Sequence, residues 1–182
     1  MNHAAHGSTT ELPYKLACLC DLRDADGRVL LLERKRTPNK GLFSPIGGKL
    51  DVATGESPAQ CAVREIKEEA GIDVPIERLH LGGLIAETAF EGRGHWLLFY
   101  YRVLGPVVVP EHEIDEGKLA WHPHDAIDAL ALPETDRKII WPLIREHEAG
   151  PGQTRPGFFA AHIDCTAPEL TWSIEQSEPA IV

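Results

Sequence analysis

The sequence has few basic side chains and no long apolar segment. Its 18 lysine and arginine residues are outnumbered by 28 aspartate and glutamate residues, so the formal net charge is -10. A protein with this charge repels nucleic acid polymers and anionic membranes, and we expect neither as a main partner. No run of roughly eighteen apolar residues occurs, and residues 1–11 lack the apolar stretch of a secretion signal. These absences predict a soluble, cytoplasmic protein.

Cysteine is scarce, and its spacing is uninformative. The sequence has four cysteines and no C-x-x-C pair. Cys18 and Cys20 are expected on the same face of a strand, and we predict a reduced cytoplasmic protein without disulfides. Cys61 is interpreted as a small buried hydrophobic residue rather than a nucleophile, because the sequence places no histidine beside it.

The length and composition indicate one globular domain. The chain has 182 residues, of which 43% are hydrophobic, and this is enough for one sizeable core but short for two. We expect a flexible arm over residues 1–12 and a single domain over residues 13–182. Residues 151–182 are expected to form a C-terminal hairpin packed on that domain.

Strand-like segments occur before, between and after helical ones, which predicts an α+β (mixed α/β) fold. The turn composition of residues 24–27 predicts a hairpin between the first two strands. The expected strands are residues 14–22, 28–34, 79–90, 95–104, 158–165 and 170–174, and two of the expected helices are residues 123–130 and 135–148.

A further helix is predicted from its capping residues. Ser57 provides a capping hydroxyl, Pro58 suits the first helical position, and Gln60 lies three residues after the cap. Gly71 is the expected stop, because glycine readily adopts the left-handed conformation that ends helices. We therefore expect a helix from Ser57 to Gly71.

Three glutamates of this helix are candidate metal ligands. Glu65, Glu68 and Glu69 are spaced i, i+3 and i+4, which places them within a wedge of about 100° around a helix axis. Like charges this close repel, and Mg²⁺ or Mn²⁺ would offset the repulsion because hard cations prefer carboxylate oxygens. A solvated acidic helix face is the alternative interpretation.

The residues around these glutamates resemble the Nudix signature, G-x5-E-x7-R-E-U-x-E-E-x-G-U, in which U is aliphatic. Every spacing agrees from Glu56 onward, whereas seven residues (49–55) separate Gly48 from Glu56 in place of five. The extra residues leave the helix unchanged and alter only the loop before it. The matching residues are Gly48, Glu56, Arg64, Glu65, Ile66, Glu68, Glu69, Gly71 and Ile72.

The resemblance implies a fold, a cofactor and a reaction. The fold would be a Nudix-type α/β/α sandwich with a mixed central sheet. The reaction would be the metal-dependent hydrolysis of a nucleoside diphosphate linked to another group, with Mg²⁺ or Mn²⁺ as cofactor. The implied metal ligands are Glu65, Glu68, Glu69 and the carbonyl of Gly48, and the implied supporting residues are Arg64 and Glu56.

Phosphoanhydride hydrolysis also needs a group that takes a proton from water and cations that meet the phosphates. Glu116 and Glu113 are the candidate proton acceptors outside the helix, and a solvated acidic loop is the alternative. Arg34 belongs to the densest basic cluster, together with Lys35, Arg36 and Lys40, and these side chains are candidates for the outer phosphates. A solubilising loop is the alternative.

Beyond the signature, the chain resembles the MutT-like branch, which hydrolyses oxidised purine nucleoside triphosphates. Residues 43–49 (FSPIGGK) are similar to its W-N-G-F-G-G-K segment, so Lys49 is a candidate substrate-binding residue. Ser44 stands where that branch has a base-reading asparagine, and Leu132 where it has a stacking tryptophan. Glu134 or Asp136 could bind a purine edge. An acid that favours the helix dipole is the alternative for both.

The implied substrate is a small nucleotide, with 8-oxo-dGTP converted to the monophosphate and pyrophosphate as the first expectation. ADP-ribose, nucleotide sugars and dinucleotides are alternative substrates. A nucleotide sensor without turnover and an isomerase on the same fold are alternative classes, and the isomerase would need a reactive Cys61. The sequence leaves open whether the protein is a monomer or a homodimer.

Overall fold

The computed structural model describes residues 13–37 and 39–181, and the arm expected over residues 1–12 lies outside them. Its strands are β1 (Tyr14–Asp21), β2 (Val29–Arg34), β3 (Phe43–Pro45), β4 (Leu79–Phe90), β5 (Gly94–Val103), β6 (His112–Ile114), β7 (Gly117–His122), β8 (Phe158–Asp164) and β9 (Thr171–Glu178). Its helices are α1 (Pro58–Glu65), α2 (Trp141–Glu146), π-helical turns at Ile66–Ala70 and Asp136–Ile140, and 3₁₀ turns at Ile76–Arg78 and His124–Ala129. None of these helices is long and apolar enough to cross a bilayer.

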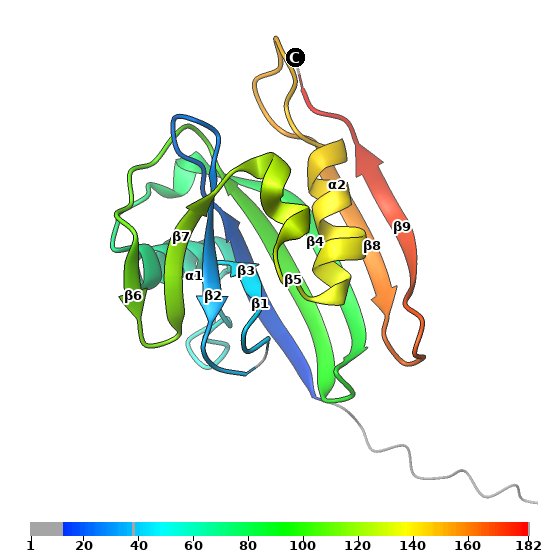
Figure 1. Cartoon of the computed structure of the whole chain (residues 1–182). Coiled ribbons are helices and arrows are strands. Elements are labelled where there is room, and N and C mark those ends of the chain that lie inside the picture. The colour runs from blue at the N-terminus through cyan, green and yellow to red at the C-terminus, as the bar shows by residue number, and fades with distance from the viewer. Residues whose placement is uncertain (1–12, 38, 182) are drawn as a thin grey trace, which may run out of the picture.

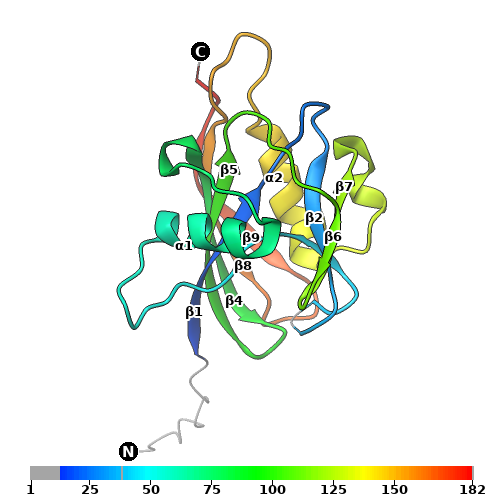
Figure 2. The same cartoon turned by 90° about the vertical axis from the view of Figure 1, so that its left-hand side faces the viewer.

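The strands form two sheets that lie between the helices (Figure 1). The larger sheet has the order β1-β5-β4-β8-β9, and the smaller one has the order β3-β2-β7-β6. The larger sheet is mixed, because β1 runs parallel to β5 and β4 parallel to β8, whereas β4 and β5 are antiparallel. Helix α1 covers one side and α2 the other, as the turned view in Figure 2 shows. The mixed α/β fold expected from the sequence is confirmed.

Side chains that alternate along the strands build two hydrophobic cores, one on each side of the sheets. In β2, Leu31 packs in the core that contains Trp141 and Phe159. Its neighbours Leu30 and Leu32 pack in the core beneath α1. All three leucines are fully buried, and each burial stabilises the fold by about 1.5–3 kcal/mol. A continuous apolar strand therefore indicates burial on both faces.

The prediction that the first two strands form a hairpin across residues 24–27 is wrong. The turn exists, but β1 pairs with β5 in one sheet while β2 pairs with β3 and β7 in the other. The two segments are joined by the isolated bridge between Arg23 and Val29 and by hydrogen bonds between Asp24 and Arg28 across the turn. Residues 24–27 do form a turn, and β1 and β2 each pair over a longer register with strands that are distant in the chain.

Two other segments differ in detail from the sequence prediction. The acidic segment at residues 111–116, for which a solvated loop was the alternative interpretation, contains β6, which pairs antiparallel with β7. The helix expected over residues 135–148 consists of the π-helical turn Asp136–Ile140 followed by α2. The hairpin expected near the C-terminus is present, because β8 pairs with β9 as well as with β4.

A buried ionic cluster fastens the end of β1. Asp21 is 0% exposed, and it accepts hydrogen bonds from Arg23 Nε at 2.8 Å and from the Tyr100 hydroxyl at 2.7 Å. Arg102 Nε lies 3.2 Å from the same carboxylate, and Glu148 pairs with Arg23 at 2.8 Å. Burial by itself would raise the pKa of Asp21, but the charges of Arg102 and Arg23 outweigh it and lower that pKa.

We predict that Asp21→Asn lowers the free energy of unfolding by about 3–5 kcal/mol, because two buried arginines lose their shared counter-charge. The lowered pKa adds stability above the ordinary aspartate value of 3.8, and this stability is lost as the pH falls through the folded-state pKa. The difference in the free energy of unfolding between the wild type and Asp21→Asn should therefore become smaller at acidic pH. Urea unfolding at several pH values measures it.

Asp26→Asn, at an exposed turn residue, is the matched control and should be near neutral. An Asp21→Asn variant within about 0.5 kcal/mol of the wild type at neutral pH would contradict the prediction.

Candidate active site

Helix α1 begins and ends where its sequence predicts. Ser57 Oγ accepts the backbone N–H of Gln60 at 3.2 Å, and the Gln60 side chain accepts the backbone N–H of Ser57 at 2.9 Å. This capping box satisfies two amide groups that a helix leaves without partners. Gly71 ends the helical segment in the left-handed conformation, with φ of 71°. Both ends of the segment that carries the glutamates are therefore fixed by local interactions.

The glutamates lie at the junction of two helix types. Glu65 is the last residue of α1, whereas Glu68 and Glu69 belong to the π-helical turn that follows. A π turn is wider than an α turn, and such turns occur often at functional sites. The wedge expected for a regular α-helix is thus modified. Glu68 is exposed, and Glu69 points inward and is buried.

Arg64 connects three of the signature carboxylates. Its Nε donates to Glu56 at 2.8 Å, and its Nη1 donates to Glu65 at 2.6 Å and to Glu68 at 3.0 Å. Its Nη2 reaches the backbone carbonyl of Lys49 at 3.1 Å. The hydrogen bond from Arg64 lowers the pKa of Glu56 to about 2. One guanidinium therefore fixes the rotamers of the helix carboxylates and ties the helix to the preceding loop.

That loop lies close to β1 and to the glutamate helix, and at Gly47 the approach to the backbone of β1 leaves room for glycine only. Gly47 has φ of 138°, and a Cβ there would lie 2.1 Å from the carbonyl oxygen of Cys18. A Cβ on Gly48 would lie 2.3 Å from Glu65 Oε1. The backbone N–H of Gly47 donates to Glu69 Oε2 at 2.8 Å. Any side chain at these two positions would displace the loop or the carboxylates.

The two residues inserted before Glu56 form a turn that leaves the site intact. The backbone N–H groups of Thr54 and Glu56 donate to the carbonyl of Asp51, and Asp51 N donates to Glu56 Oε2 at 2.8 Å. Glu56 thereby keeps its pairing with Arg64. The departure from the signature spacing alters the loop surface and not the carboxylate network.

Burial and mutual repulsion shift the pKa values of the inner carboxylates. Burial raises the pKa of Glu69 to about 8 against the hydrogen bond from Gly47, and the nearby charges of Glu116 and Glu65 raise it further. Burial also raises the pKa of Glu65. Glu116 lies in the turn between β6 and β7. Arg34, which is 82 positions earlier in the sequence, donates from its Nη2 to the Glu116 carboxylate at 3.5 Å. A positive charge among these groups would relieve their repulsion.

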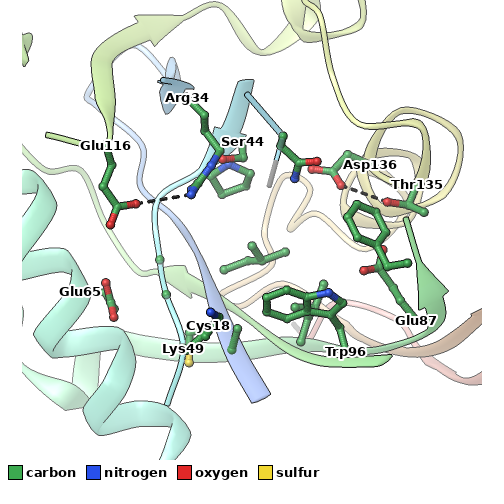
Figure 3. Close-up of a pocket in the computed structure, with 18 of the residues that line it drawn as sticks. Cys18, Arg34, Ser44, Lys49, Glu65, Glu87, Trp96, Glu116, Thr135 and Asp136 are labelled. Carbon is green, nitrogen blue, oxygen red and sulfur yellow. Dashed lines mark hydrogen bonds and ion pairs between the residues drawn. The ribbon is translucent and has the colours of Figure 1, made fainter. Parts of the chain in front are cut away.

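A cavity of about 420 Å³ opens beside this carboxylate cluster. Figure 3 shows Glu65 and Glu116 at one end, with Arg34 directed toward Glu116. Strands β1, β3, β4 and β5 contribute to the wall, as does the start of the π-helical turn Asp136–Ile140. A pocket of this size suits a small molecule of nucleotide dimensions.

The cavity brings together several residues that the sequence singled out. The lining contains Arg34, Ser44, Gly48, Lys49, Glu65, Glu116 and Asp136. Glu134 is exposed and pairs with Lys138, and it is outside this lining. Lys35 pairs with Glu113 and Arg36 with Asp115, so these charges form an exposed ionic surface. Leu132 is buried in the core rather than stacked in the cavity.

Sequence reasoning missed Glu87 and Trp96, which both line the cavity. Glu87 follows Ile85 by two residues in β4, and both are buried. An acidic residue in phase with buried apolar positions of a strand is the signal that identifies such a side chain. Trp96 lies on β5, and its ring has Lys15 Nζ at 4.8 Å and Lys49 Nζ at 6.0 Å from its centroid.

The carboxylate cluster contains oxygen donors for a divalent cation. In the described ranges, no three acidic, histidine or cysteine side chains stand in ready metal-ligand geometry. The groups present are nevertheless oxygen donors that hard cations prefer, and Gly48 leaves the space that Glu65 occupies. Burial raises the pKa values of Glu65 and Glu69, and the nearby charge of Glu116 raises both further, so a bound cation would stabilise their charged forms. The oxygen donors of these residues fit a divalent cation.

Comparison with known proteins places this site in a family. Residues 13–145 match the NUDIX domain. An uncharacterized Nudix hydrolase of Bacillus subtilis is 30% identical over 118 residues, which are 63% of this chain and 70% of that protein. An ADP-ribose pyrophosphatase of Methanocaldococcus jannaschii is 34% identical over 84 residues, which are 45% of this chain and 47% of that protein.

Solved structures agree with this assignment. The crystal structure of a MutT protein from Bacillus halodurans superposes with a TM-score of 0.67 at 26% identity, covering 88% of this chain and 97% of that one. The match of the NUDIX domain covers β1 to β7, α1, the glycine loop and the carboxylate cluster, whereas β8 and β9 lie beyond it. The chain therefore belongs to the Nudix family and is a MutT-like Nudix hydrolase.

Proposed function

We propose that the protein hydrolyses a diphosphate bond of a small nucleotide, with a nucleoside triphosphate such as 8-oxo-dGTP as the first substrate. The observation that carries the proposal is the carboxylate cluster organised by Arg64 at one end of a nucleotide-sized cavity. Cleavage of a triphosphate would release the nucleoside monophosphate and pyrophosphate.

Glu65, Glu68, Glu69 and the Gly48 carbonyl are the proposed ligands of Mg²⁺ or Mn²⁺. A divalent cation held there would neutralise charge on the phosphate oxygens and would lower the pKa of a water molecule. Arg64 is a positioning residue, because it acts through the carboxylates that it holds. Glu56 is also a positioning residue, because its ion pair with Arg64 fixes the Arg64 side chain.

Other side chains of the cavity handle the substrate. Arg34 and Lys49 lie in the lining and supply positive charge for the phosphates. Glu116 faces the cluster from the β6–β7 turn and takes the proton of the attacking water. As the new bond from the water oxygen to phosphorus forms, the bridging phosphorus–oxygen bond breaks and its electrons leave with the released phosphate group.

ADP-ribose is the second candidate substrate. The support is the similarity to the ADP-ribose pyrophosphatase of Methanocaldococcus jannaschii over 84 residues. The carboxylate cluster acts on the diphosphate that the two substrates share, so the cluster by itself does not separate them. Nucleotide sugars and dinucleotides share that diphosphate too.

A hydrolysis screen tests the proposal. The purified protein is incubated with Mg²⁺ or Mn²⁺ and with oxidised and unmodified nucleoside triphosphates, ADP-ribose, nucleotide sugars and dinucleotides. Products are separated by chromatography, which identifies the bond that is cleaved. Turnover of at least one of these diphosphates is expected. Nucleotide binding without any turnover would instead support a sensor.

We predict that Glu65→Gln and Glu69→Gln each reduce kcat by about a hundredfold or more, since each removes a charged ligand that stabilises the transition state. Steady-state rates on the best substrate of the screen measure the effect. Glu77→Gln, at an exposed glutamate outside the cavity, is the matched control and should retain full activity. Unchanged rates in both Glu65→Gln and Glu69→Gln would show that these glutamates are not part of the active site.

We also predict that Mg²⁺ stabilises the folded protein, because it binds the native carboxylate cluster and not the unfolded chain. At about 100 times the dissociation constant, one site contributes about 2.7 kcal/mol. Thermal unfolding with MgCl₂ and with EDTA measures the shift in Tm. Glu69→Gln should show a smaller shift than the wild type, and an equal shift in the two proteins would exclude Glu69 as a ligand.

A further inference from the structure

Strand β9 forms an open edge of the larger sheet. It is the last strand in the order β1-β5-β4-β8-β9, and within the described residues its one ladder is the antiparallel pairing with β8. All eight residues of β9 are exposed, and the strand stands at the rim of the molecule (Figure 1). The backbone N–H and C=O groups on its outer side are therefore accessible to a further strand.

One face of β9 continues the apolar surface that α2 covers on β8. Trp172 lies opposite Ile163 of β8. Ile174 lies opposite Ala161, and residues directly opposite each other in a sheet point to the same side. Ile163 and Ala161 are buried in the core that contains Trp141 of α2. Trp172 is 53% exposed and Ile174 is 43% exposed, so the cover that α2 gives to β8 ends before these two residues.

A hydrogen bond identifies the same side of β9 independently. The Ser177 hydroxyl is hydrogen-bonded at 2.9 Å to Nε2 of His147, the residue that ends α2. Ser177 lies opposite Phe159 of β8, which is buried in the core shared with α2. This side of β9 is therefore polar where it meets the end of α2, and it is apolar at Trp172 and Ile174, which are open to solvent.

Strand β9 lacks the proline and the basic side chains that often keep an edge strand from pairing. Its sequence is TWSIEQSE, and its register with β8 is regular from Thr171 to Ile174. The opposite edge of the same sheet is occupied, because β1 donates to the glycine loop, for example from Cys18 N to the Gly48 carbonyl at 2.9 Å. Pairing of this sheet through β9 would therefore join two chains and would not continue into a fibre.

We propose that β9 is a homodimer interface, in which the β9 strands of two copies pair antiparallel around a two-fold axis at Ser173. In this register Trp172 lies opposite Ile174 of the second copy, and the symmetric pair lies across the axis. The pairing keeps equal faces on the same side of the joined sheet, so the four apolar side chains form one cluster between the two α2 helices. Glu175 lies nearer to Thr171 of the second copy than to its own equivalent, which avoids facing acids.

A second copy satisfies both open features of the edge at once. The outer backbone groups of β9 need a strand as partner, and Trp172 and Ile174 need apolar cover. The same short segment of the second copy supplies both. Residues of β9 are outside the lining of the cavity of about 420 Å³, so each copy keeps its own access to substrate. The dimer is therefore a property separate from the proposed catalysis.

Sedimentation velocity of the full chain tests the dimer over a range of protein concentrations. The wild type should reach twice the 20.1 kDa mass of one chain. Trp172→Lys and Ile174→Lys each place a charge in the apolar cluster, and each should raise the Kd of the dimer by about a hundredfold or more. Val108→Lys, at a residue that is 89% exposed between β5 and β6, is the matched control and should dimerise like the wild type.

Cross-linking between copies tests the register. Ser173→Cys places two thiols on the axis, where Cβ atoms of facing residues are about 4.5–5.5 Å apart, and diamide as oxidant should convert them to one disulfide. Glu178→Cys is the matched control on the same exposed strand, because its two thiols would be about 33 Å apart along the strands. The wild type accounts for any cross-linking through Cys165, which is partly exposed. Near-ultraviolet circular dichroism verifies the fold of each variant.

The outcomes are independent of the hydrolysis screen. A wild type that stays monomeric at about 200 µM overturns the homodimer, and the edge is then free for a strand of a different protein. A dimer that persists unchanged in folded Trp172→Lys and Ile174→Lys overturns it too, because its interface lies elsewhere. A dimer without cross-linking of Ser173→Cys overturns the register. A wild-type dimer that both lysine variants lose, with cross-linking of Ser173→Cys and not of Glu178→Cys, supports the proposal.

Discussion

The site depends on one guanidinium that bridges helix and loop. Arg64 contacts Glu56, Glu65 and Glu68 and also the backbone carbonyl of Lys49, so it balances several negative charges and fixes their geometry at once. A planar group with five N–H donors can do this, whereas a lysine ammonium cannot reach so many acceptors in fixed directions. The rotamers of the carboxylates and the path of the glycine loop follow from this arrangement.

The second constraint is close approach. Gly47 lets the loop lie against the backbone of β1 at a distance that a Cβ would forbid, and a Cβ at Gly48 would displace the carboxylate of Glu65. The buried carboxyl group of Glu69 then accepts a hydrogen bond from the backbone N–H of Gly47, which holds this side chain beneath the loop. Packing of α1 on the sheet through residues such as Ile66 keeps the helix in place. Precision in the cluster thus comes from backbone contact supported by a rigid core.

Much of the local structure was predictable because its causes are local. The capping box at Ser57 and the left-handed Gly71 were read from residue types and spacing, and both are confirmed. The extents of β4 and β5 followed from alternation. The partners of β1 and β2 were not predictable from a turn, because pairing depends on which distant strands offer the longest register. The π-helical turn after Glu65 also departs from the regular periodicity that sequence reasoning assumes.

The sequence by itself determined the fold family and the acidic helix, since a spaced motif on one helix needs only the regular geometry of a helix turn. Tertiary structure alone decided which distant side chains share the cavity. Glu87 and Asp136 are separated by almost fifty positions and come from a strand and a helix start, so only the packing of these elements makes them neighbours. These two side chains lie close together because of burial and long-range strand pairing, and local sequence patterns do not predict either.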